Sequence, residues 1–250
     1  MTTSYGSLCD DFYINLRVNT QLELPEDRDT ILHFFDRVQK QYPTMNTFFQ
    51  REDGEFCLSE DTEAGSYRKL VIGPDHIFCG SFNPHTVEEV DDQNRFILDH
   101  MTYALGVNHL DINNIELMYA MDFEYDGNHD EVFAEALFRD TPFMNFLDMP
   151  DATPLGFAPS FLIGLTDDCR LQAKVSFESN TTAYNVRTGK YKDSGALSVY
   201  LTIRQYPVPS ERFDSLSAYE IQRHYCETIM NDKVIPNIVT PIVGALAHRR

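Results

Sequence analysis

The first regular pattern in the chain alternates apolar and polar side chains. Apolar residues occupy every second position from Phe12 to Val18 of the stretch FYINLRVNTQLEL, residues 12–24, and this period of two is typical of a strand with one buried face. The spacing then becomes helical, with an apolar stripe formed by Ile31, Phe34, Phe35 and Val38. Because proline and acidic side chains favour the first turn of a helix, we expect a helix that opens at Pro25 and ends before Pro43.

Turn signals divide the rest of the first half into strands and a long helix. NTFFQREDGEFCLSE, residues 46–60, predicts a hairpin about Asp53-Gly54, because Asp-Gly favours a tight turn between strands. SYRKLVI and HIFCGSF predict two further strands. PHTVEEVDDQNRFILDHMTYALG then has helical spacing, with Thr86 as N-cap, Glu89 as its capping-box partner and Gly106 at the C-terminal end.

The second half of the chain repeats this order. NIELMYAMDFEY alternates like the first strand and leads directly into the helical stretch HDEVFAEALF. PSFLIGLTDDCRLQAKVSFES predicts a hairpin about Asp167-Asp168, and TAYNVRTG and ALSVYLTIRQY predict two more strands before the closing helix SLSAYEIQRHYCETIM. The predicted order is β-α-β-β-β-β-α, twice.

The two closing helices also share a residue pattern at a fixed offset. Each has the apolar spacing of one buried face with a polar residue in third place. Val87, Val90, Asn94, Ile97 and Met101 correspond to Leu216, Tyr219, Arg223, Cys226 and Met230. The shared order and spacing together predict an internal duplication.

A polar, turn-rich stretch near residues 108–114 separates the two halves. We expect an N-terminal tail at residues 1–11, a first α+β repeat at 12–110 and a second at 111–250, packed closely on the first. The predicted fold class is α+β, with antiparallel sheets and helices packed on one face. The sheets can join into one continuous curved sheet of about ten strands, whose uncovered face is the expected place for function.

Composition and charge exclude several classes of function. The 42% hydrophobic and 24% charged residues are typical of a folded globular chain. Thirty-nine acidic and 20 basic residues give a net charge of -19, which repels phosphates, so we expect no nucleic-acid binding. The five cysteines form no C-x-x-C pair, which argues against a disulfide framework or a zinc knuckle. The chain shows neither a signal peptide nor an unbroken apolar span, and we expect a cytoplasmic protein without membrane contact.

The repeated β-α-β-β-β-β-α order, over residues 12–245, resembles the saddle of the TATA-binding protein. One such unit is also similar to part of the helix-grip folds, which hold apolar ligands. The resemblance implies a long sheet with an open underside. In the TATA-binding protein that underside meets DNA through basic and apolar residues, and the acidic balance of this chain departs from it. The phrases GNHDEVFAEALF and DCRLQAKVSFESNTTAYNVRTG resemble uncharacterised bacterial proteins of no assigned activity, which implies no mechanism.

The stretch MDFEYDGNHDEVFAEALF, residues 121–138, gathers acidic residues and one histidine before an apolar helix. Consecutive helix residues diverge by about 100° each, so His129, Asp130 and Glu131 cannot converge on one metal ion. We interpret Asn128 as the N-cap and the two acids as a complement to the helix dipole. On this interpretation His129→Ala leaves fold and binding unchanged.

Two other polar groups have ordinary structural interpretations. Glu220, His224 and Glu227 project from one face of the closing helix, and we interpret them as surface salt linkage and not as half of a metal site. The stretch RTGKYKDSG, residues 187–195, lacks the spacing of a phosphate loop and is interpreted as a hairpin loop.

Tyrosine and arginine pairs are the best candidates for binding residues. Tyr67 and Arg68 lie in one predicted strand, and Tyr184 and Arg187 lie in the corresponding predicted strand of the second half. Both residue types are favoured as binding anchors, and an arginine is distinctive in an acidic chain.

These observations favour a non-enzymatic protein-binding or assembly module that uses the exposed sheet face. The expected partner is another protein or a second copy of the chain, as in a homodimer. Two alternatives stay open. One is a small-molecule binding protein or enzyme with an apolar cavity between sheet and long helix, and the other is an acidic mimic of nucleic acid. We expect no cofactor, and the sequence singles out no catalytic residue.

Overall fold

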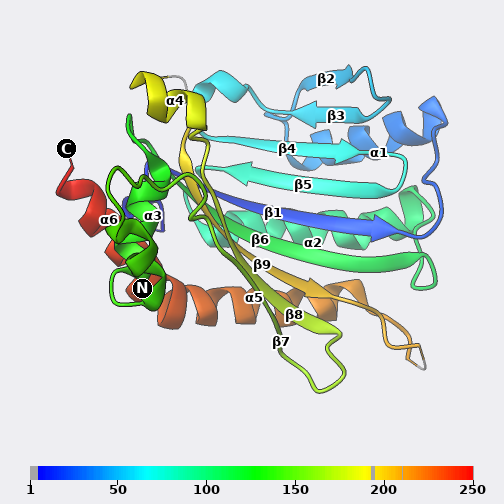
Figure 1. Ribbon diagram of the computed structural model, residues 1–250. Coiled ribbons are helices and arrows are strands. Elements are labelled where there is room, and N and C mark those ends of the chain that lie inside the picture. Colours follow the sequence, from blue (N-terminus) through cyan, green and yellow to red (C-terminus); the bar gives the residue numbers. More distant parts are fainter. Residues whose placement is uncertain (1–4, 193–194, 210, 250) are drawn as a thin grey trace.

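A single open antiparallel sheet joins both halves of the chain (Figure 1). The computed structural model describes residues 5–192, 195–209 and 211–249. Within these residues, the sheet contains nine strands in the following order: β2 (Thr47–Gln50), β3 (Phe56–Ser59), β4 (Tyr67–Ile72), β5 (His76–Phe82), β1 (Asp11–Thr20), β6 (Ile112–Phe123), β9 (Leu197–Gln205), β8 (Leu171–Glu178) and β7 (Ser160–Gly164).

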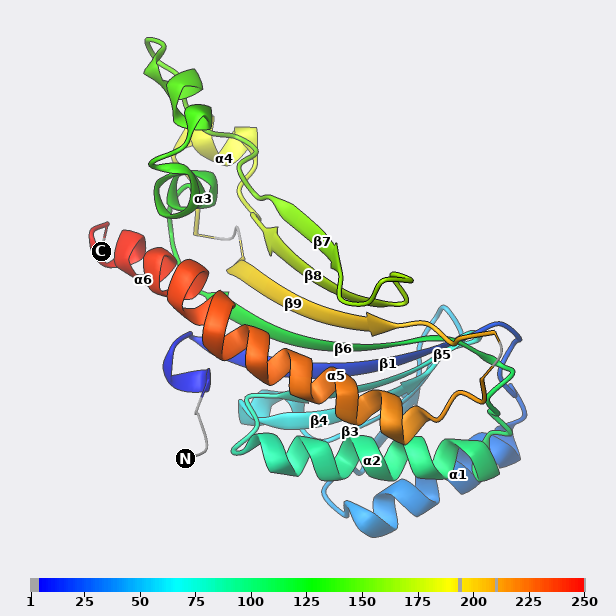
Figure 2. The ribbon, with the colours of Figure 1, turned by 90° about the horizontal axis from the view of Figure 1, so that it is seen from below.

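The helices cover one face of this sheet, which confirms the predicted α+β class. The described helices are α1 (Arg28–Gln41), α2 (Val87–Ala104), α3 (His129–Phe138), α4 (Ala183–Thr188), α5 (Ser215–Ile229) and α6 (Thr240–Ala247), and α1, α2 and α5 form the layer on this face. Figure 1 looks onto the opposite face, with α1, α2 and α5 behind the strands. Figure 2 shows the same helices as a layer on one side of the sheet.

Strict alternation in β1 produces these two faces. Ile14, Leu16 and Val18 are buried on the helix side, while Tyr13 and Arg17 point to the uncovered side, since side chains alternate along a strand. Every second residue of the strand therefore belongs to the core.

The helix starts agree with the predicted caps. Thr86 and Asn128 cap α2 and α3 by accepting backbone N–H groups, and Gly106 follows α2 with a φ of 72°. The first helix begins later than Pro25, because the Asp27 side chain accepts the Thr30 N–H and so caps α1.

The second half differs from the prediction at TAYNVRTG, which is helix α4 and not a strand. Thr182 and Asn185 form a reciprocal capping box, and Gly189 ends the helix with a φ of 67°. The second half therefore contributes four strands, β6 to β9, where the first contributes five. The described sheet has nine strands where about ten were expected, and the expectation of a strand containing Tyr184 and Arg187 is wrong for this reason.

The chain ends in a long, interrupted helix. Helix α5 continues through a π-helical segment, Met230–Val239, into α6. Pro236 lies in that segment, and the Thr240 N–H donates to the Ile235 carbonyl, five residues back. Proline has no backbone N–H and cannot donate a hydrogen bond within a regular helix. The wider turn of the π-helical segment accommodates it.

Part of the predicted N-terminal tail belongs to the core. Residues 1–4 lie outside the described residues, whereas Tyr5–Ser7 forms a 3₁₀ turn. The Tyr5 ring is buried. Its centre lies 5.2 Å from the centre of the Phe12 ring and 5.9 Å from that of the Tyr119 ring. The core therefore begins before β1.

A buried polar link joins the two closing helices. The Tyr219 hydroxyl of α5 donates to Asp91 Oδ1 of α2 at 2.6 Å and accepts from Asn94 Nδ2 at 3.2 Å. Arg223 lies 3.4 Å from the other Asp91 oxygen. Burial raises the pKa of Asp91, and the hydrogen bond from Tyr219 opposes that rise. Asn94 and Arg223, the polar residues in third place, both lie in this link.

Tyr219→Phe removes the donor and leaves the buried Asp91 carboxylate with one partner fewer. We expect a loss of about 1–3 kcal/mol in the free energy of unfolding at pH 7, measured by urea denaturation. Tyr103→Phe, on the exposed side of α2, is the control and should change stability by less than about 0.5 kcal/mol. Equal effects of the two substitutions would contradict this role for the Tyr219 hydroxyl.

Candidate functional site

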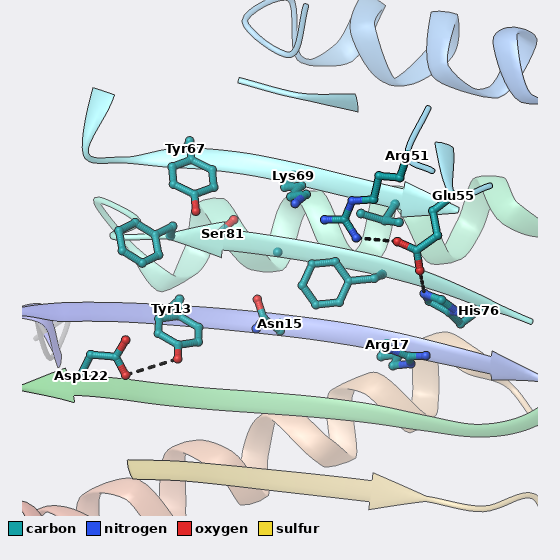
Figure 3. Close-up of a pocket in the computed structure, with 14 residues that line it drawn as sticks. Tyr13, Asn15, Arg17, Arg51, Glu55, Tyr67, Lys69, His76, Ser81 and Asp122 are labelled. Atoms are coloured by element: carbon teal, nitrogen blue, oxygen red, sulfur yellow. Dashed lines mark hydrogen bonds and ion pairs between the residues drawn. The ribbon is translucent and has the colours of Figure 1, made fainter. Parts of the chain in front are cut away.

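The uncovered sheet face carries a pocket of about 470 Å³ over β1, β4 and β5 (Figure 3). Because the strands pair in register, its lining falls into three rows that cross the strands. The register places Tyr67, Phe82 and Tyr13 in the first row, Lys69, Gly80 and Asn15 in the second, and Val71, Phe78 and Arg17 in the third. The hairpin between β2 and β3 adds Arg51 and Glu55 at one end.

Aromatic rings form one wall of this sheet pocket. The Phe82 ring stacks on Tyr67 at 5.1 Å and on Tyr13 at 5.8 Å, with planes inclined by 18° and 20°. Three near-parallel rings therefore stand side by side across three strands. Such a wall offers apolar surface with little side-chain freedom to lose.

Gly80 leaves room for the floor of the pocket. A Cβ at this position would lie 2.9 Å from the Phe78 ring and 2.8 Å from Asn15 Oδ1. Both distances are shorter than van der Waals contact, so the missing side chain allows the Phe78 ring and the Asn15 amide to approach the backbone of β5.

The pocket is rich in cationic groups. Arg51 pairs with Glu55 at 2.5 Å, and His76 lies 3.3 Å from the same carboxylate. Arg17 Nε donates to Asn19 at 2.8 Å, but neither Arg17 nor Lys69 forms an ion pair with a carboxylate among the described residues. The neighbour of Arg17 across the sheet, Glu116, instead accepts from Arg204 at 2.7 Å. Two half-buried cations thus face the pocket without a described carboxylate at ion-pair distance.

The opposite end of the pocket is acidic. Tyr13 donates to Asp122 at 3.3 Å, and Tyr200 donates to Glu178 at 2.7 Å. Burial raises the pKa of the Asp122 carboxyl, and the hydrogen bonds from Ser198 and Tyr13 oppose that rise. Arg17 and Tyr13 are four residues apart on β1, which separates the cationic and acidic ends by about 13 Å.

The structure places the predicted binding residues in different environments. Tyr67 lines the sheet pocket. Arg68 points to the helix side, where it lies 3.0 Å from Glu60 and stacks over the Tyr42 ring at 5.3 Å. Its charge is therefore used in packing β4 against α1.

Tyr184 and Arg187 lie on α4, and Tyr184 lines a separate hollow beside the loop that follows it. The Arg187 guanidinium lies 5.7 Å from the centre of the Tyr184 ring. The two predicted pairs are therefore not brought together, and only Tyr67 belongs to the sheet pocket.

Sequence reasoning missed Arg17, Lys69 and Gly80. Arg17 and Lys69 occupy the polar phase of alternating strands, and Gly80 interrupts the strand HIFCGSF. A glycine inside a strand pattern is a signal for a close approach. The sequence does not reveal that these three residues meet, because the register between distant strands decides it.

The acidic cluster of residues 121–131 is a structural joint. As predicted, Asn128 caps α3. Asp130 accepts from Phe157 N at 2.6 Å and from Ser179 Oγ at 2.9 Å, which ties two loops to the start of the helix. Among the described residues, no group of three or more His, Cys, Asp or Glu side chains could hold a metal ion.

His129 is more important for the fold than the sequence suggests. Its ring is completely buried, with Nδ1 3.3 Å from the Asn180 N–H and Nε2 3.1 Å from the Tyr125 carbonyl. Nδ1 therefore accepts, Nε2 donates, and the ring is neutral. The expectation that His129 is dispensable is revised for this reason.

The surface interpretation of Glu220 and Glu227 is confirmed. Arg223 lies 3.6 Å from Glu220 and 2.8 Å from Glu227, and Arg95 of α2 lies 2.8 Å from Glu220. These residues form salt linkage along and between helices. Of the predicted hairpin loop at residues 187–195, Asp193 and Ser194 lie outside the described residues, and the loop begins within α4.

No family model, curated protein or solved structure matches the chain. The resemblances to the TATA-binding protein and to uncharacterised bacterial proteins stay predictions. Within the described residues, every helix is too short or too polar to cross a membrane.

His129→Ala should lower the free energy of unfolding by about 2–4 kcal/mol, because it opens a cavity and leaves two backbone groups unpaired. Burial also lowers the pKa of His129 below its ordinary value of 6.5. The unfolded chain therefore binds a proton more readily than the folded chain. The stability that depends on neutral His129 is present above pH 6.5 and is lost as the pH falls toward the lower, folded-state pKa.

The matched control is His129→Gln, which cannot titrate. We expect the difference in stability between the wild type and His129→Gln to shrink from about pH 7.5 to about pH 5.5, measured by chemical denaturation at each pH. A difference that stays constant over this range would show that His129 titrates alike in both states.

Proposed function

We propose that the protein binds a small, planar organic anion in the sheet pocket and acts as a binding protein. The observation that carries the proposal is the pair of cations, Arg17 and Lys69, that face the pocket without a described carboxylate partner. Acids outnumber bases 39 to 20 in this chain, and a half-buried cation that has no described carboxylate at ion-pair distance therefore favours an external anion. A carboxylate or phosphate is the group that such a pair would hold.

The remaining lining supports a planar body for the ligand. Phe78 at the floor and the Tyr67, Phe82 and Tyr13 rings at the wall offer aromatic surface. Asp122 and Tyr13 at the far end offer a hydrogen-bond acceptor and a hydroxyl. The volume of about 470 Å³ falls within the range of small-molecule sites, which is roughly 300–1,000 Å³.

The proposal keeps function on the uncovered sheet face, where the sequence predicts it, and assigns a small ligand to that face. The alternative cavity between sheet and long helix is less favoured. Leu16, Leu117 and Ile97 fill that space, each with an exposed fraction of 1% or less.

Lys69→Met tests the anion site directly. The probe is 8-anilinonaphthalene-1-sulfonate, an aromatic anion with a planar naphthalene ring that fluoresces when it is bound. We expect its affinity to fall about tenfold in Lys69→Met and in Arg17→Met, because each substitution removes one charge-assisted contact. The readout is the dissociation constant from a fluorescence titration.

Lys174→Met is the matched control, because Lys174 lies on β8 in the same cross-strand row as Lys69 but outside the pocket. The affinity of the Lys174→Met variant for the dye should stay within about twofold of that of the wild type. An equal loss in Lys69→Met and Lys174→Met would show that the dye responds only to overall charge, and the proposed function would then fail.

Gly80→Val tests the shape of the pocket without changing charge. The new side chain should displace Phe78 and Asn15 and occupy the floor, with a loss of about 1–3 kcal/mol in stability. We expect dye binding to fall by at least about tenfold, while circular dichroism stays native. Dye binding that survives in Gly80→Val would place the ligand elsewhere.

A further inference from the structure

The far edge of the sheet carries an apolar surface on the helix side that no described helix covers. Ile163 of β7 ends a cross-strand row that begins at Phe48 of β2 and passes through Leu58, Leu16 and Leu117. The members between these two ends are at most 3% exposed, whereas Ile163 is 55% exposed and Phe48, beside α1, is 44% exposed. In the adjacent row, Phe161 is 54% exposed.

The first half shows what covers the equivalent surface there. Helix α1 buries its apolar stripe on the helix side of β2 to β4, and its Phe35 ring contacts Phe48 of β2 at 5.7 Å. Leu58 and Leu70 beneath it are buried. In the second half, α3 packs on α6 and α5 packs on β6 and β9. Figure 2 shows β7 and β8 beyond α5. Helix α3 contacts the end of β8, where its Phe133 ring lies 5.4 Å from that of Phe177, but it leaves Ile163 and Phe161 of β7 exposed.

We call the helix-side residues Phe161, Ile163 and Val175 the β7 strip. The connection that leads into β7 extends this exposed apolar surface, with Phe143, Phe146, Met149 and Leu155. Seven of the fifteen exposed large apolar side chains in the described residues fall between residues 143 and 163, and all of them except Leu162 lie in the β7 strip or in the connection that leads into it. Such concentration marks an interaction surface, since exposed apolar residues are otherwise scattered.

The charge around the strip selects the partner. Between Arg139 and Arg170, every charged residue is an aspartate. Asp148 and Asp151 lie before β7, and Asp167 and Asp168 lie after it, all exposed. A second copy of this chain would bring the same negative charge to the contact, whereas a basic partner would be attracted.

We propose that the β7 strip binds an amphipathic helix of a partner protein, with an apolar stripe like that of α1 and flanking lysine or arginine residues. This helix would occupy the place on the second half that α1 occupies on the first. The apolar stripe would cover Phe161 and Ile163, and the basic residues would meet the flanking aspartates. The inference does not depend on the sheet pocket, which lies on the opposite face.

The test uses a synthetic peptide that copies Arg28–Gln41 of α1, with Asp29→Lys and Asp36→Lys. We expect saturable binding to the full chain by fluorescence anisotropy of the labelled peptide. Phe161→Asp and Ile163→Asp should each weaken it at least about tenfold, because each places a charge in the apolar contact. Raising the salt concentration from about 0.05 M to about 0.5 M should also weaken it.

Leu162→Asp is the matched control, because Leu162 is equally exposed on the same strand but points to the opposite face. Binding should stay within about twofold of the wild type in this variant. Circular dichroism of all three variants establishes that each is folded.

Three outcomes would overturn the proposal. One is the absence of saturable binding to the wild type. Another is an equal loss in Leu162→Asp, which would indicate pairing at the strand edge or general apolar contact. The third is a wild-type dimer in sedimentation that Phe161→Asp dissociates and Leu162→Asp does not, which would make a second copy of the chain the occupant.

Discussion

β1 and β6 pair along their full length at the centre of the sheet, and the positions of the other elements depend on this pairing. The register runs from Asp11 opposite Asp122 to Thr20 opposite Ile112, and it joins the two halves into one hydrogen-bonded layer. It also sets which residues face the helices. A slip of one residue in either strand would move its buried side chains to the uncovered face. Moving the side chains of Ile14, Leu16 and Val18 alone from the core to the uncovered face would cost several kcal/mol in the free energy of folding.

The same pairing explains why the pocket and its charges lie on one half. Arg17, Glu116 and Arg204 are neighbours in one row across β1, β6 and β9. One carboxylate lies between two guanidinium groups and pairs with Arg204 at 2.7 Å. Arg17 is thus left facing the pocket, where Lys69 lies one row away. The positive end of the pocket therefore follows from a shortage of acids in this row, although acids dominate the chain as a whole.

Much of the fold could be predicted from local signals. Alternation identified β1 and β6, the Asp53-Gly54 turn identified the β2–β3 hairpin, and side-chain caps identified the starts of α2 and α3. These features depend on residues close in sequence, and local physical chemistry decides them. The strand predicted at TAYNVRTG was wrong because its alternation competes with a Thr182–Asn185 capping box and a C-terminal glycine, which favour a short helix.

The candidate site was much harder to predict than the fold. Of the four residues proposed from sequence, only Tyr67 lines the pocket, because pairs such as Tyr67 and Arg68 necessarily point to opposite faces of a strand. Adjacent residues of a strand cannot share a site on one sheet face, whereas Arg17, Lys69 and Gly80 share one across three strands. His129 was undervalued for a related reason: the loops that bury it come from residues some 50 positions away.

The departures from internal symmetry are the places where the fold leaves surface unused. The first half has a glycine in β5 that opens the sheet pocket, and the second half lacks the covering helix that α1 supplies. Neither departure helps stability, since a strand glycine forfeits packing and an uncovered Ile163 forfeits burial. Natural sequences depart from structural consistency mainly where binding requires it. The two departures lie on opposite faces of one sheet, so the proposed small ligand and the proposed partner helix would not compete for one surface.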